Sequence, residues 1–453
     1  MTGDRTVGGE RVRETSVPDT VRLGRALLVR WPGRGGERGR SRAVAWAVRL
    51  GADRHAARLL DRLRRRYGPG PLRIALPGRR AVLLLSPRDV RRVLAARPSP
   101  FTAATGGASA AHLRPLGEVP RGEAENWNAR RVLDEEALDA HQKVHRNGGR
   151  YMVQVQEETG ELLDLVSKEP DLSWNEYARV HGRVVRRIVL GDAARDDRML
   201  TDLLDRLVGQ GRPLRRRARA VVRDTYLRRL RMYAERAEPG TLAGALAEAP
   251  SPAGVEPMVQ ITQWMAGFGG AGTVAFRTLA LLAVHRDRLA RVRSEFQGLP
   301  RRSLPSPVSV PFLRACLLES ARLWPVEPVI LRRSTEETHW NGRAVPAESV
   351  FTVIPAFFDR DRKTVPFADR FTPEAWLDGR AASDGAIVPF GGGAGRCPGE
   401  NLALLVGTTF LTALLRDHEP RLLRPTTLHA RRPLPQRLDH TALHLRFEPA
   451  PPH

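Results

Sequence analysis

The chain has 453 residues, enough for a large hydrophobic core, and a formal net charge of +24 at pH 7. Almost all of the positive charge is arginine, spread along the chain among 50 acidic residues, which argues against the clustered basic patch of a nucleic-acid-binding protein. Two cysteines and the lack of any stretch near ~18 uninterrupted apolar residues favour a cytoplasmic protein without disulfides or a membrane span.

Residues 1–42 are rich in Arg, Gly, Glu and Thr, and we expect them to form a disordered extension. Residues 43–453 are expected to form one domain. Helical spacing of apolar residues begins near Ala43 and ends near Leu63. The runs 72–75 and 81–85 predict a hairpin with its turn at Pro77-Gly78, and Ser86-Pro87 predicts the start of a short helix.

A helix is predicted from Asn126 to Arg146. It contains Trp127 and Arg131, whose i, i+4 spacing places the indole and the guanidinium on one face. Taken alone, this pair is typical of a surface arginine that packs on a partly buried tryptophan.

The longest apolar helix is predicted from Glu256 to about His285, which places it in the middle of the molecule. Its centre holds Gly267, Gly269, Gly270 and Gly272, followed by Thr273. Each glycine costs a helix roughly 1 kcal/mol relative to alanine, and core packing alone does not explain four of them. We therefore expect a kinked or widened turn that makes room for a ligand.

A further helix is predicted from Phe312 to Leu323, with Glu319 and Arg322 on one face at i, i+3. The E-x-x-R spacing is common in a chain this rich in arginine. The surrounding residues, Leu318 to Pro325, make this occurrence more specific than the others.

The most informative stretch is Pro389-Phe-Gly-Gly-Gly-Ala-Gly-Arg-Cys-Pro-Gly399, which runs directly into an apolar helix. A phosphate-binding loop would need a lysine followed by Ser or Thr, and neither is present. A packing loop with an incidental thiol does not explain the five glycines from Gly391 to Gly399. A thiol among the free N–H groups of a helix N-terminus is favoured as thiolate, which is one of the axial ligands of haem iron.

Phe390, Gly393, Cys397 and Gly399 fit the haem-binding signature of the cytochrome P-450 (haem-thiolate) superfamily, and the stretch resembles it at four of five positions. Other features resemble the same family in the same order along residues 43–450. They are the Trp127/Arg131 pair, the glycine-rich helix, the Glu319/Arg322 pair and the P-E-x-W stretch that ends at Trp376.

The resemblance implies a mainly α fold with small β-sheets in a single catalytic domain, with haem b as cofactor and Cys397 as ligand of the iron. It assigns the haem propionates to Trp127, Arg131, Arg332 and Arg396, and the oxygen-binding part of the central helix to Gly269, Gly270 and Thr273. Phe390, Gly393 and Gly399 would shape the haem loop, and Glu319 with Arg322 would serve structure.

The implied activity is oxidation of an apolar small molecule, of the kind found in secondary metabolism, with O2 and electrons from a separate ferredoxin and reductase. Three residues depart from the family's pattern: Gly395 replaces a basic residue, Gly272 an acid and Ala375 an arginine. These departures leave open a peroxide-driven peroxygenase, an oxidase whose substrate supplies the missing proton-relay group, and a haem-binding protein with weak or lost catalysis.

Overall fold

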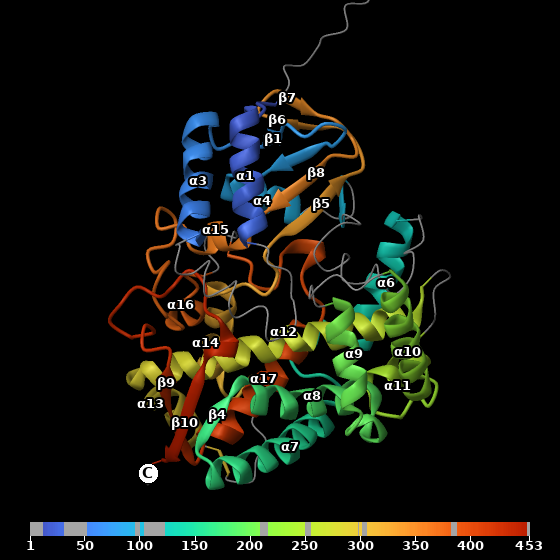
Figure 1. Cartoon of the computed structure of the whole chain (residues 1–453), viewed down its shortest axis with the longest axis vertical. Helices are drawn as coiled ribbons and strands as arrows, with labels where there is room; N and C mark the ends of the chain where they lie inside the picture. Colours follow the sequence, from blue (N-terminus) through green and yellow to red (C-terminus); the bar gives the residue numbers. More distant parts are fainter. Residues whose placement is uncertain are drawn as a thin grey trace, which may run out of the picture.

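The computed structural model describes residues 12–30, 52–95, 100–103, 123–208, 216–249, 255–297, 299–300, 306–381 and 387–450. Helices dominate this part of the chain (Figure 1). In the first half they are α1 (Val17–Arg30), α3 (Ala52–Tyr67), α4 (Pro87–Ala95), α6 (Glu123–Ala137), α7 (Gly148–Lys168), α8 (Trp174–Leu190), η2 (Asp192–Ala194), α9 (Arg198–Val208) and α10 (Arg216–Ala234). In the second half they are α11 (Leu242–Glu248), α12 (Pro257–Val284), α13 (Arg286–Gln297), α14 (Pro311–Leu323), α15 (Pro355–Asp359), α16 (Glu374–Leu377), η3 (Gly393–Gly395), α17 (Glu400–Leu415) and η4 (His440–Ala442).

The strands are short, as predicted. They are β1 (Leu72–Ile74), β2 (Ala81–Leu83), β3 (Phe101–Ala103), β4 (Asp171–Ser173), β5 (Ile330–Ser334), β6 (Thr338–Trp340), β7 (Arg343–Val345), β8 (Val350–Val353), β9 (His418–Arg424) and β10 (His444–Pro449). Within the described ranges they form small sheets in the orders β1-β2-β8-β5-β3, β4-β10-β9 and β6-β7. The fold class, mainly α with small β-sheets, is confirmed.

Most predicted elements agree with the structure. The hairpin pairs β1 with β2 in antiparallel register, Leu72 opposite Leu83. The helix predicted to end at Arg146 ends earlier, at Ala137. The chain turns there because Asp139 adopts a positive φ of 46°, and the Arg146 side chain donates hydrogen bonds back to Asp139 and to the carbonyl of Glu136.

The segment 12–30 is ordered, contrary to the expected disorder of residues 1–42. The backbone of Arg73 accepts a hydrogen bond from the N–H of Thr15 and donates one to the carbonyl of Arg13, which attaches the segment beside β1, and α1 packs against α3. Asp19, only 2% exposed, accepts a hydrogen bond from Tyr67 and pairs with Arg66. Composition alone predicts disorder, because an arginine-rich composition does not reveal these few specific contacts. The predicted boundary at residue 43 lies outside the described residues.

Helix α12 crosses the larger part of the molecule beneath the sheet and the blue N-terminal helices (Figure 1). It packs against α8, α14, α17 and β9, which explains its apolar sequence. Within the described ranges it is the one helix long and apolar enough to cross a membrane, and 67% of its most apolar window is buried inside the protein. Such burial is what a core helix shows.

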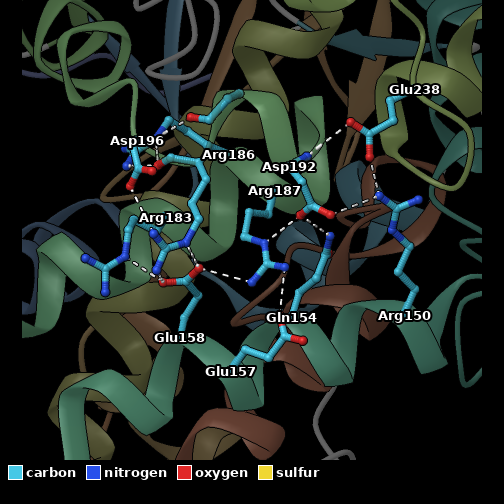
Figure 2. A network of polar contacts seen from close by, with 12 residues as sticks. Arg150, Gln154, Glu157, Glu158, Arg183, Arg186, Arg187, Asp192, Asp196 and Glu238 are labelled. Carbon is cyan, nitrogen blue, oxygen red and sulfur yellow. Dashed lines mark hydrogen bonds and ion pairs between the residues drawn. The ribbon is translucent and has the colours of Figure 1, made fainter. Parts of the chain in front are cut away.

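A buried carboxylate joins α7 to α8 and to the turn that follows α8 (Figure 2). Glu158 has a side chain that is 1% exposed, and its oxygens accept hydrogen bonds from Arg183 (2.6 Å), Arg187 (3.1 Å) and Arg195 (2.6 Å). Burial opposes ionisation of Glu158, but the hydrogen bonds from Arg195 and Arg183 outweigh it and lower the pKa of the carboxyl.

Glu158→Gln should lower the free energy of unfolding by roughly 3 kcal/mol at pH 7, because it leaves three guanidinium groups facing a neutral amide. The lowered pKa means that this stabilisation is complete above the ordinary carboxyl pKa of 4.5 and is lost as the pH falls through the folded value. Urea unfolding at pH 7 and pH 4 measures both effects. Glu161→Gln is the matched control, since Glu161 binds Arg183 and Arg195 but is 52% exposed.

Candidate functional site

The stretch 389–399 folds into a tight loop in front of α17. The N–H of Cys397 donates to the carbonyl of Phe390 (2.8 Å), and the N–H of Arg396 donates to that of Gly393 (3.1 Å). Gly393 has a φ of +57°, and a Cβ there would lie 1.8 Å from the carbonyl oxygen of Leu94 in α4. Only glycine fits this position, so the close contact with α4 fixes the shape of the loop.

Cys397 lies two residues before Gly399, the N-cap residue of α17. Its side chain is solvent-accessible although the surrounding protein is dense, whereas Cys316 is buried in the core. Burial raises the pKa of the Cys397 thiol to about 11, and a hydrogen bond from the Gly399 N–H only partly offsets this. This direction opposes the thiolate that the helix N-terminus favours, and a bound cation would favour the thiolate.

A pocket of about 420 Å³ opens beside the loop. It is lined by Arg131, Glu135, Ala140, His141, Arg314, Gly393, Ala394, Arg396, Cys397, Pro398, Glu400 and Asn401. Arg131 of α6 donates to the carbonyl of Arg396 and pairs with Glu135, which ties α6 to the loop. Arg396 points outward, 61% exposed, and pairs with Glu400 at 2.6 Å.

Arg332 of β5 fills the space above Gly395. A Cβ at residue 395 would lie 1.9 Å from Nη2 of Arg332, so no larger residue fits there while the guanidinium keeps this position. Burial, together with the positive charge of Arg131, lowers the pKa of Arg332 to about 10. Among the described residues no carboxylate pairs with Arg332, which leaves a partly buried cation suited to an anionic ligand group.

The glycines of α12 fall into two kinds. A Cβ at Gly267 or Gly269 would meet nothing within 4 Å, so this face borders open space. A Cβ at Gly270 would lie 2.6 Å from Val326, and one at Gly272 would lie 2.7 Å from the ring of His181. The hydroxyl of Thr273 donates to the carbonyl of Gly269 (3.2 Å), one turn earlier.

The widened turn expected in α12 is not present, because the helix is α-helical throughout Pro257–Val284. Two of the glycines instead allow side chains from other elements to approach the helix backbone. Sequence spacing carries no signal for the partners Val326 and His181, which come from distant parts of the chain.

Gly272→Ala and Gly269→Ala should therefore shift stability in opposite directions. Gly272→Ala should lower the free energy of unfolding by roughly 1–3 kcal/mol through overpacking against His181. Gly269→Ala should raise it by about 0.5–1 kcal/mol, since the new methyl group meets nothing and helix propensity improves. Urea unfolding of both variants checks this. Equal effects would mean that the contact between position 272 and His181 is absent.

Glu319 and Arg322 of α14 form a fully buried ion pair with two hydrogen bonds of 2.7 Å. Arg322 also donates to the carbonyls of Phe367, Ala368, Asp359 and Arg370. Glu319 accepts from the N–H of Thr372 and the indole of Trp376, both at 2.9 Å.

Ala375, which replaces an arginine of the family's pattern, is completely buried. The indole N–H of Trp376 binds the Glu319 carboxylate, to which the family's usual arginine at residue 375 is expected to bind.

The predicted site residues thus fall into connected groups. Arg131, Arg332, Phe390, Gly393, Arg396, Cys397 and Gly399 surround or form the cysteine loop. Gly269, Gly270 and Thr273 lie on α12, which packs against α17. Trp127 belongs to α6, one turn before Arg131, but its side chain lies outside the described part of the chain.

Residues 258–433 match the family model for cytochrome P450. The chain is 31% identical over 163 residues to a cyclooctat-9-en-7-ol 5-monooxygenase of Streptomyces melanosporofaciens, which covers 35% of this chain and 35% of that protein. It is 33% identical over 180 residues to the cytochrome P450 monooxygenase mpaDE' of Penicillium brevicompactum, covering 36% of this chain and 21% of that protein. The matched stretches thus span about a third or less of these relatives' own length.

Two solved structures share the fold. The crystal structure of a cytochrome P450 (CYP102L1) superposes with a TM-score of 0.74 at 18% identity, covering 98% of this chain and 100% of that one. The retinoic acid bound cyanobacterial CYP120A1 superposes with a TM-score of 0.69 at 20% identity, covering 86% of this chain and 94% of that one. At these identities the likeness establishes the fold alone.

Proposed function

We infer that this chain, which belongs to the cytochrome P450 superfamily, is a haem-thiolate monooxygenase that oxidises an apolar small molecule. The observation that carries the proposal is the accessible thiol of Cys397, enclosed by protein in a rigid glycine loop before α17. The partly buried guanidinium of Arg332, without a carboxylate partner among the described residues, lies against the same loop.

The described residues fit haem b, the cofactor of the family. Cys397 would bind the iron, and the cation would supply what the thiol lacks, since alone it has a raised pKa. Arg332 and Arg131 would neutralise the propionates, with Trp127 one turn from Arg131. Arg396 is the weaker candidate for that role because Glu400 already binds its guanidinium. When bound, the haem supplies the activation of oxygen.

The residues of α12 would form the opposite wall of the reaction site. Gly267 and Gly269 border open space, where a side chain would take up room needed by oxygen and substrate. The Thr273 hydroxyl, held by the Gly269 carbonyl, would hold a proton donor at the site. An apolar substrate is supported by the apolar composition of α12 and by the name of one relative, a cyclooctat-9-en-7-ol 5-monooxygenase. We also propose that this oxidation belongs to secondary metabolism.

We propose a separate ferredoxin and reductase as the electron source, with the face around the cysteine loop as the docking surface. Arg131, Arg314 and Arg396 supply its positive charge. Glu135 and Glu400 already pair with these arginines, so an acidic partner would have to compete with them. A cytoplasmic location remains part of this proposal.

A peroxide-driven peroxygenase is the second candidate, favoured by the absence of an acid at Gly272. Arg277, the nearest arginine on α12, donates to the carbonyls of Trp324 and Leu438 and is thereby held in a structural role. The remaining alternatives are an oxidase whose substrate supplies the missing proton-relay group and a haem-binding protein with weak or lost catalysis.

The test of the leading proposal is the spectrum of the purified, reduced protein with carbon monoxide. We expect haem b in equal amount to protein and the red-shifted Soret band of a thiolate ligand. A band without the shift, or protein without haem, would refute the proposal. Turnover with hydrogen peroxide alone, against turnover with ferredoxin, reductase and NAD(P)H, separates the two oxidants.

A further inference from the structure

The imidazole of His181 occupies the place of a side chain at residue 272. His181 lies on α8, is 6% exposed, and its ring atoms Cε1, Nδ1 and Cγ come within 2.7–3.0 Å of where a Cβ on Gly272 would be. At the two other positions that depart from the family's pattern, a polar group also comes from another residue. Arg332 fills the space at Gly395, and the indole of Trp376 binds Glu319 beside Ala375.

The surroundings of His181 do not explain a histidine by packing. Its ring stacks on Tyr177 (centroids 5.8 Å apart, planes at 17°) and faces Phe410 of α17. Among the described residues none hydrogen-bonds to the imidazole, and the Tyr177 hydroxyl is buried without a partner. A buried polar group without a hydrogen bond is unfavourable, so a leucine would suit a purely structural role better.

A neutral imidazole suits transfer of a proton. Burial lowers the pKa of His181 to about 4, so the ring is uncharged at neutral pH and carries one donor and one acceptor nitrogen. It can take a proton from water at one nitrogen and release one from the other, ending neutral again. It lies against Gly272, the residue that precedes Thr273 in the chain, and the Thr273 hydroxyl donates to the carbonyl of Gly269.

We propose that His181 is a positioning residue for proton delivery, and that its imidazole supplies through water the polar group that α12 lacks at Gly272. This inference rests on the proposed monooxygenase. In that reaction O2, two electrons from the reductase system and two protons from water join one substrate molecule, giving oxygenated product and water. His181 would pass those protons toward Thr273 and is itself unchanged.

The first test concerns the contact and needs no turnover. Gly272→Ala should lower the urea midpoint in the wild-type background and raise it slightly in a His181→Ala background, where the ring no longer opposes the methyl group and alanine improves helix propensity. Additive changes in the double variant would overturn the claim that the imidazole fills position 272.

The second test concerns proton delivery. His181→Leu, which keeps the volume but loses the polar atoms, should slow O2 consumption with ferredoxin, reductase and NAD(P)H about tenfold and enlarge the solvent isotope effect in D2O. His181→Gln should recover most of the rate, as should His181→Ala with Gly272→Asp, which returns an acid to α12. His285→Leu is the matched control, since His285 is a buried histidine of the same region whose Nδ1 binds the Leu281 carbonyl. It should leave the isotope effect unchanged.

The outcomes separate the inference from the function on which it rests. A normal carbon-monoxide band in every variant, with wild-type O2 consumption and isotope effect in His181→Leu, would overturn only the role of His181. A wild-type protein without that band would overturn the monooxygenase itself. If His181→Leu does not fold, a slow His181→Gln protein together with an inactive His181→Ala/Gly272→Asp protein would equally contradict the proposal.

Discussion

Cys397→Ser should remove the red-shifted Soret band of the reduced carbon-monoxide complex and at least 90% of the proposed monooxygenase activity (roughly 1.4 kcal/mol or more in activation free energy). A serine hydroxyl has no pKa low enough to serve as the anionic ligand of the iron, and it lacks the electron donation of sulfur. The glycine loop does not depend on the thiol, because its backbone hydrogen bonds and the contact of Gly393 with Leu94 remain. The protein should therefore fold with wild-type stability while its spectrum changes.

Cys316→Ala is the control. Cys316 is completely buried in α14, and burial raises the pKa of its thiol well above the ordinary value. The substitution should cost a small cavity and leave the spectrum intact. A red-shifted band that survives in Cys397→Ser, or is lost in Cys316→Ala, would show that the ligand has been assigned to the wrong cysteine.

Arg322→Lys should destabilise the protein by about 3–5 kcal/mol, the largest effect we expect from a single conservative substitution outside the haem ligand. The planar guanidinium binds Glu319 at two points and four backbone carbonyls at once, and all of these groups are buried. A lysine ammonium has three donors and cannot match this arrangement. Urea unfolding and the amount of haem retained after purification measure the loss.

Arg446→Lys provides the matched comparison at the surface. Arg446 also binds a carboxylate at two points, that of Asp171, but both side chains are about half exposed. The change in the free energy of unfolding should stay within about 0.5 kcal/mol. Similar losses in the two variants would mean that burial of the Glu319–Arg322 pair is not what stabilises this part of the fold.

The sequence allowed correct prediction of those features that depend on neighbouring residues. Periodicity predicted α12 and α14 nearly to the residue, and the turn residues predicted the β1–β2 hairpin. The cysteine loop was recognisable because its glycines are close together in the chain.

The contacts at the three positions that depart from the family's pattern were not predictable in this way. Arg332 and Gly395, His181 and Gly272, and Trp376 and Glu319 lie between 57 and 91 residues apart. Such pairs arise from the packing of whole helices and strands, and no local pattern records them. The same holds for the thiol of Cys397, whose raised pKa comes from burial by many distant residues.

The short contact between residues 13–15 and Arg73 also bears on how the protein behaves in solution. β1 lies at one edge of its sheet within the described ranges, and an open edge invites pairing with another chain. The N-terminal segment covers part of that edge with its own backbone. A chain shortened to begin at residue 43, as composition would suggest, should expose the edge and self-associate or aggregate more readily than the full chain. The N-terminal segment would then reduce aggregation because it covers this strand edge.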